Sequence, residues 1–210
     1  MGIRSRHAAI GVATAFILIS ATAGHASADE STDSSITADE TTDINDRQDW
    51  DEDTEVQLPD QDGPLVCDTP STWYSITSKK PYHVPSGWNG TKFKDGPGGT
   101  MTVSVTKSGT ISAEVGGTGD FTASGIIAKA KVTVSSKIGG SVTITTGHQY
   151  AHKIANNKYG HLQYGSWGYK VSWKRYRSAG GKNCGGVKIG QGTATLPTSE
   201  TGWKYWETSS

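Results

Sequence analysis

The sequence is poor in the large side chains that usually fill a thick hydrophobic core. Among 210 residues there are three Phe, two Met and two Cys, whereas Gly alone accounts for 27. From residue 64 onward only six side chains are acidic: Asp68, Asp95, Glu114, Asp120, Glu200 and Glu207. A body of this composition has to bury thin layers of small and β-branched side chains, which favours sheets.

Sequence signatures of catalysis are also scarce. The six acids form no motif of paired carboxylates, and Gly165-Ser166-Trp167-Gly168 lacks the residue that a nucleophile elbow places between its first glycine and its serine. No glycine-rich phosphate loop follows a strand and opens a helix. His148, His152 and His161 have no nearby acid or Cys, which is more typical of solvent-facing side chains than of a zinc site. The sequence therefore predicts a protein that is not an enzyme and holds no cofactor or metal.

The two signs of charge cancel over the whole chain but lie in different segments. Residues 29–63 contain 14 Asp or Glu and one basic residue, Arg47, while residues 64–210 contain 17 Lys or Arg. Charge at that density with little apolar content does not build a core, so we expect residues 29–63 to form a disordered, extended acidic arm. Pro and Gly residues between Leu58 and Pro64 mark its boundary with the body.

The first 28 residues have the organisation of a signal peptide. Arg4 and Arg6 precede an apolar stretch over residues 8–23, and Ala26-Ser27-Ala28 is a small-x-small cleavage pattern. The stretch is interrupted by polar residues and is shorter than the ~20 apolar residues of a spanning helix. We therefore expect cleavage after Ala28, a secreted, extracellular protein, and no stable membrane anchor.

Secretion gives a meaning to the two cysteines, Cys67 and Cys184. An oxidising compartment favours a disulfide between them, and they lack the C-x-x-C spacing of a reactive pair. The chain-entropy model gives such a bond roughly 4–5 kcal/mol of stabilisation. Residues 64–210 have the usual length of one domain, so we expect a single disulfide-stapled body.

Two stretches of the body alternate between apolar and polar residues, which is typical of strands with one dry and one wet face. Between residues 101 and 115 the apolar set is Met101, Val103, Val105, Ile111, Ala113 and Val115. Between residues 126 and 145 it is Ile126, Ala128, Ala130, Val132, Val134, Ile138, Val142 and Ile144. This pattern predicts an all-β fold with an elongated antiparallel sheet or ribbon, and it disfavours a helix over residues 126–145.

Aromatic and basic residues are interleaved between residues 159 and 177. Trp167, Tyr169, Val171 and Trp173 share one face of a strand, so they favour a buried sheet face, which the closing segment 203–206 is expected to join. Stacking rings and cations also suit a nucleic acid, but a secreted protein is a poor candidate for that partner, and we expect none. A polysaccharide surface stays open as an alternative.

The acidic arm contains one group of candidate partner-binding residues. Trp50 stands among acids, and Val56 and Leu58 follow it, so a partner could be steered by charge and anchored by these apolar side chains. A solvated Trp in a flexible linker is the other interpretation. The proposed partner-binding set is Asp49, Trp50, Asp51, Glu52, Asp53, Val56 and Leu58.

Two kinds of interaction protein fit this layout. A pore-forming hairpin would need alternating strands like those above. Its apolar face would be thin here, because many of its residues are Ala and Gly. A non-catalytic adaptor would use the acidic arm to enter a basic groove of one partner and the β-body to hold another. The arm favours the adaptor, because a pore former has no evident use for it.

The layout, together with Tyr164-Gly165-Ser166-Trp167-Gly168-Tyr169 and Trp203-Lys204-Tyr205-Trp206, resembles the adaptor subunits of the umbrella toxin particles that streptomycetes release against competing bacteria. The resemblance implies that residues 29–63 thread into the helical-repeat ring of a large toxin subunit. It also implies that the β-domain presents a lectin-like subunit to target surfaces. The alternating pattern is similar as well to that of aerolysin-like pore-forming proteins.

The disulfide is directly testable. We expect mass spectrometry of the exported protein to show Cys67 joined to Cys184, and we expect reduction to lower the free energy of unfolding by up to about 4 kcal/mol. Two free thiols in the exported protein would contradict the expectation.

Overall fold

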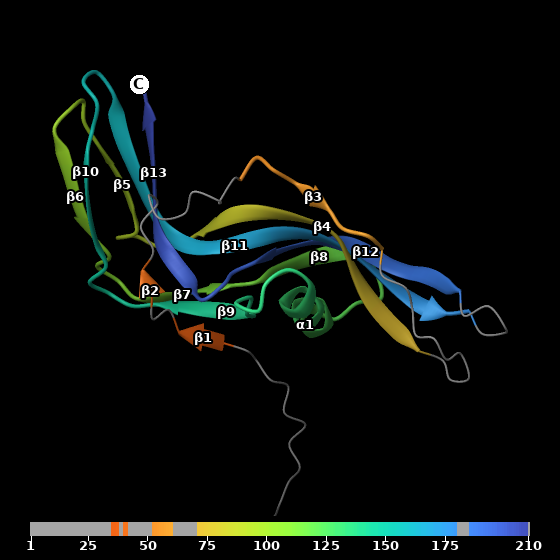
Figure 1. The fold of residues 1–210 in the computed structure, drawn as a ribbon. Helices are drawn as coiled ribbons and strands as arrows, with labels where there is room; N and C mark the ends of the chain where they lie inside the picture. Colours follow the sequence, from red (N-terminus) through yellow and green to blue (C-terminus); the bar gives the residue numbers. More distant parts are fainter. Residues whose placement is uncertain (1–34, 38–39, 42–51, 61–70, 180–184, 210) are drawn as a thin grey trace, which may run out of the picture. The chain divides into compact units, whose positions relative to one another are not determined.

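The computed structural model describes residues 35–37, 40–41, 52–60, 71–179 and 185–209. Within these ranges the chain forms thirteen strands and one short helix, which confirms the all-β class (Figure 1). The signal peptide at residues 1–28 and both cysteines, Cys67 and Cys184, lie outside the described residues. The disulfide and the cleavage site therefore stay predictions.

The strands fall into three sheets. The largest contains β2 (Glu40–Thr41), β3 (Val56–Gln57), β4 (Thr72–Pro85), β5 (Lys92–Asp95), β8 (Glu114–Gly119), β11 (Tyr159–Ser178), β12 (Gly186–Leu196) and β13 (Glu200–Thr208). A second sheet contains β1 (Ser35–Thr37), β7 (Gly109–Ser112) and β9 (Ser141–Ile144), and a third pairs β6 (Thr100–Ser104) with β10 (Gln149–Lys153). The helix α1 (Ala123–Thr133) lies in the connection between β8 and β9.

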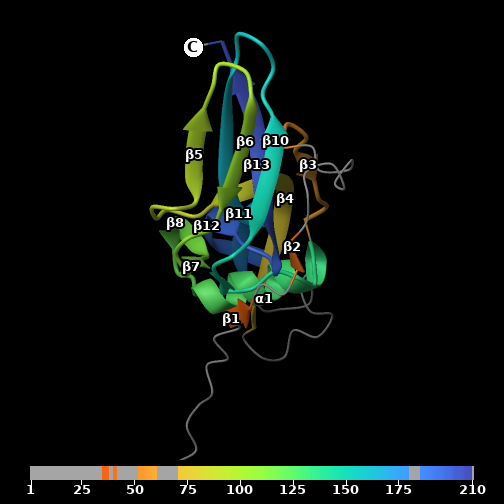
Figure 2. The ribbon, with the colours of Figure 1, turned by 90° about the vertical axis from the view of Figure 1, so that its left-hand side faces the viewer.

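Strand β11 is the centre of the large sheet. It is 20 residues long, against the usual 3–10, and it pairs with four other strands. Over residues 160–163 it lies between β13 and β5, and over residues 169–177 it lies between β12 and β4. Figures 1 and 2 show β11 running through both ends of the sheet. The long strands expected from the sequence thus exist, but at residues 72–85 and 159–178.

On each edge of β11 one partner strand ends and another begins near the middle of the strand. Buried side chains complete the backbone hydrogen bonding at these two places. On one side Ser166 Oγ donates to the carbonyl of Thr198 at 2.8 Å and accepts from the Thr198 N–H. On the other side Ser86 Oγ donates to the carbonyl of Tyr164 at 2.6 Å, and Gln163 Nε2 donates to the carbonyl of Ser86. Because buried backbone groups need partners, these side chains let the neighbours bend while β11 continues.

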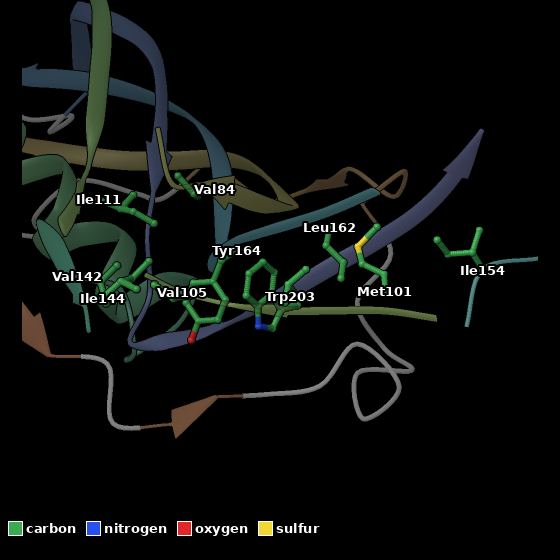
Figure 3. Packing of buried hydrophobic residues seen from close by; sticks show 11 residues of the cluster. Val84, Met101, Val105, Ile111, Val142, Ile144, Ile154, Leu162, Tyr164 and Trp203 are labelled. Carbon is green, nitrogen blue, oxygen red and sulfur yellow. The ribbon is translucent and has the colours of Figure 1, made fainter. Parts of the chain in front are cut away.

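The hydrophobic core changes face along β11. Leu162 and Tyr164 belong to one buried cluster with Trp203, and Val171 and Trp173 belong to another. Successive side chains of a strand point to opposite faces, so residues an odd number apart lie on opposite sides of the sheet. Figure 3 shows the first cluster, which is covered by Met101 and its neighbours. The second is covered by α1.

Most of the aromatic strand face predicted from the sequence is buried. Trp167, Val171 and Trp173 are buried, and Tyr169 packs partly buried against the second cluster. The prediction that residues 203–206 join the same core as Trp173 is wrong. Trp203 is buried in the first cluster, on the opposite face, and Trp206 stacks on His161.

The prediction against a helix over residues 126–145 is wrong, because residues 123–133 form α1. Ile126 and Ala130 are buried, and Val134 and Ile138 pack in the same cluster. Positions spaced by four residues share a helix face as well as a strand face, so Ile126 and Ala130 fit either, while Val134 and Ile138 follow the end of the helix at Thr133. Packing against Ile76 and Trp173 selects the helix, and Val132 of the strand phase is left 87% exposed. No continuous ribbon forms, since β6 pairs with β10, β7 with β9, and β8 with β12.

Two glycines give a matched test of the packing at the middle of β11. A Cβ at Gly168 would lie 2.1 Å from the carbonyl oxygen of Leu196, whereas a Cβ at Gly116 has nothing within 4 Å. We expect Gly168→Ala to lower the free energy of unfolding by about 1–3 kcal/mol, because a backbone atom has to move. Gly116→Ala, in β8, should change it by no more than about 0.5 kcal/mol. Urea unfolding of both variants measures the difference, and equal stabilities would contradict this packing.

Candidate interaction site

The described parts of the acidic arm form three short strands, and each pairs with a different edge strand of the body. β1 pairs in parallel with β9, β2 pairs in parallel with β13, and β3 pairs antiparallel with β4. The N–H of Leu58 extends the last pairing by donating to the carbonyl of Thr77 at 2.8 Å. An edge strand carries a row of unpaired N–H and C=O groups, and these additions satisfy part of that row.

Glu52 fixes one end of the segment formed by residues 52–60. Its carboxylate forms an ion pair with Lys204 of β13 and accepts a hydrogen bond from the backbone N–H of His83 on β4. Desolvation alone would raise the pKa of Glu52, but the hydrogen bonds from Lys204 and His83 outweigh it and lower the pKa. The carboxylate is therefore held charged where two strands of the large sheet meet.

Asp60 fixes the other end of this segment. Lys174 Nζ lies 2.5 Å from Asp60 Oδ2, Tyr176 donates to the same oxygen at 2.9 Å, and Ser75 donates to Oδ1 at 2.8 Å. Desolvation opposes the shift, but these three donors lower the pKa of Asp60. Exposed ion pairs contribute only about 0–1 kcal/mol each, so the Lys174–Asp60 pair holds this end of the segment weakly.

The predicted partner-binding residues do not behave as one group. Asp49, Trp50 and Asp51 lie outside the described residues. Glu52 is bound to the body as above, Leu58 is half-buried against the second cluster, and Val56 is 42% exposed with its backbone paired to Lys79. Asp53 is exposed. Asp60, which has the most partners, was missed because Ser75, Lys174 and Tyr176 are far from it in the sequence.

Near this segment, His83 has a pKa far from its ordinary value. It is buried, and the centres of its ring and of the Trp167 ring are 4.5 Å apart. Its Nε2 lies 3.2 Å from the carbonyl oxygen of Gly202. Desolvation lowers the pKa of His83 to about 4, helped by the positive charge of Lys204 and opposed by Gly202 and Glu52. The imidazole is therefore neutral at physiological pH.

A polar trough crosses the face of the large sheet opposite α1. Residues paired across strands point to the same face, which places Lys170 beside Lys80 and Thr195, and Ser172 beside Ser78 and Thr193. Two adjoining pockets of about 440 and 370 Å³ lie over these residues and share Lys170 and Thr195. The first extends to Tyr82, Trp88 and Glu114, and the second extends to Glu55 of the acidic segment. We call this surface the polar trough.

The histidines considered as metal ligands are separated and stack on aromatic rings. His148 stacks on Tyr164, and His161 stacks on Trp206. The ring centres of His152 and Tyr205 are 3.8 Å apart. Within the described ranges no group of three His, Cys, Asp or Glu side chains could hold a metal ion, and α1 is not long enough to cross a membrane.

Comparison of the chain with protein-family models, with curated proteins and with solved structures found no match.

His83 makes stability depend on pH in a defined direction. Its pKa is lower in the folded state than the ordinary 6.5, so its contribution is complete above pH 6.5 and is lost as the pH falls toward 4. The lowered pKa values of Glu52 and Asp60 act in the same direction below their ordinary values. We expect the free energy of unfolding to fall by about 3 kcal/mol from His83 alone.

Urea unfolding between about pH 7 and about pH 4 measures this effect. His83→Gln, which does not titrate, should show a clearly smaller pH dependence, with a remainder from His148 and His161, whose pKa values burial also lowers. The same pH dependence in both proteins would show that His83 titrates normally.

Proposed function

We propose that this protein is a secreted, non-catalytic adaptor subunit of a multiprotein antibacterial toxin particle. Its acidic arm, residues 29–63, docks into a larger toxin or scaffold protein, and its β-domain presents a surface-binding, lectin-like subunit. The proposal joins the resemblance found in the sequence to the contacts of the arm. It requires neither a cofactor nor a catalytic group.

The observation that carries the proposal is the way in which the arm meets the body. Short strands added to a sheet edge, with a few ion pairs, are a recurring mode of peptide recognition. The arm uses this mode on its own body through β3, Glu52 and Asp60. Because these contacts are few and only partly buried, a basic groove on a partner competes with them.

The pore-forming alternative loses the feature that suggested it. It depended on residues 126–145 forming part of a long amphipathic ribbon, and these residues instead contain α1 and the short strand β9. The polysaccharide alternative loses three of the rings that suggested it, because Tyr164, Trp167 and Trp173 are buried. The adaptor depends on neither segment.

Two changes to the arm should have opposite effects on partner binding. Deleting residues 29–63 should abolish capture of the partner, because it removes the docking segment. The charge reversal Lys174→Glu with Lys204→Glu should keep capture or strengthen it by up to about tenfold, because it releases Asp60 and Glu52 from the body. Binding should weaken with salt, and Trp50→Ala should speed dissociation.

The measurement begins with the immobilised mature chain and concentrated culture medium of the organism that encodes it. Retained larger proteins are identified by mass spectrometry, purified and titrated against each variant. Lys92→Glu with Lys94→Glu is a matched control, since it reverses two charges elsewhere on the body. If the arm-deleted protein captures the partner at full affinity, or if the purified chain alone permeabilises liposomes, the adaptor proposal is wrong.

A further inference from the structure

The polar trough has the size and lining of a ligand site. Its two pockets, about 440 and 370 Å³, fall within the range of roughly 300–1,000 Å³ that small-ligand sites occupy. Hydroxyl groups of Ser and Thr form much of the floor, and two aromatic rings, Tyr82 and Trp88, line one end. Aromatic surface beside a few converging polar groups is the usual composition of such a site.

The aromatic end is organised before any ligand binds. Trp88 Nε1 donates to the carbonyl of Lys107 at 2.9 Å, and the indole packs over Gly109, where an added Cβ would lie 2.7 Å from the ring. Lys170 Nζ lies 3.8 Å from the centre of the Tyr82 ring. A site whose side chains are already held loses less entropy when it binds a ligand.

The charges of the trough indicate a neutral ligand. Lys80 and Lys170 are balanced by Glu55 and Glu114, so the surface has no net charge with which to attract a polyanion. Among the described residues Glu114 has no hydrogen-bond or ion-pair partner, which leaves its carboxylate available to accept hydrogen bonds. Hydroxyl, ammonium and carboxylate groups together both donate to and accept from hydroxyl groups.

We propose that the polar trough binds a neutral polysaccharide. Sugar hydroxyls match the floor of Ser172, Thr193 and Thr195 together with Lys170 and Glu114. The C–H face of a sugar ring, which is slightly positive, fits against the indole of Trp88, while Lys170, which lies over the Tyr82 ring, donates to a sugar hydroxyl. The site extends along the sheet from Trp88 to Glu55, so it takes several sugar units of one chain. This proposal stands independently of any partner protein, although Glu55 of the acidic arm lines one end of the trough.

Calorimetric titration with maltotriose, cellotriose, chitotriose and mannotriose tests the proposal on the full mature chain. We expect at least one of these neutral oligosaccharides to bind with a dissociation constant of about 1 mM or tighter. Its affinity should change less than about twofold with added salt, because no ion pair forms. Poly-glutamate and heparin are the charged competitors, and stronger binding of either, weakened by salt, would favour an acidic partner and overturn the proposal.

Two matched lysine–tyrosine pairs locate the site. Tyr82→Ala and Glu114→Gln should each weaken oligosaccharide binding by about tenfold. Tyr159→Ala is the control, because Lys94 lies over the Tyr159 ring at 4.7 Å outside the trough, and it should leave the affinity unchanged. Circular dichroism checks that each variant is folded. No binding by any of the four oligosaccharides at about 10 mM, or equal losses in Tyr82→Ala and Tyr159→Ala, would overturn the proposal.

Discussion

The rest of the structure depends on the continuity of β11. A strand of 20 residues stays paired on both edges only if its neighbours change partway, and here β13 gives way to β12 on one edge and β5 to β4 on the other. Each change exposes backbone groups that have to find partners, and Ser166, Thr198, Ser86 and Gln163 supply them. Without these hydroxyl and amide groups, the same bend would leave buried donors and acceptors unpaired.

Because β11 continues without a bulge between Tyr164 and Val171, its two cores lie on opposite faces. Each core is small and needs a separate cover, which β6 and its neighbours supply at one end and α1 at the other. On the face opposite α1, β11 carries the polar residues Lys170, Ser172 and Lys174, and this part of the sheet becomes the polar trough. A candidate binding surface is thus a consequence of the way in which the core is divided.

Charge segregation has a second consequence in the folded molecule. Acids placed before the body meet lysines carried by it, and Glu52 and Asp60 each find such a partner. The Asp60 pair is largely exposed and the Glu52 pair is partly buried, and together with the short strand β3 they keep segment 52–60 at the sheet edge. An arm that is held loosely by its own body is suited to exchange between partners, and this property connects the fold to the adaptor role that we propose.

The sequence alone determined the fold class, the separation of charge and most of the buried strand positions. Met101, Val103 and Ile111 are buried, as their alternation predicts. Their spacing of two residues fits a strand face and does not fit a helix face. Residues 126–133 were ambiguous, because Ile126 and Ala130 satisfy a helix and a strand equally. Only contacts with Ile76 and Trp173, distant in the sequence, selected the helix. The same reason hid Asp60 and the trough: their partners come from strands far apart in the chain, and only the register of β4, β11 and β12 brings them together.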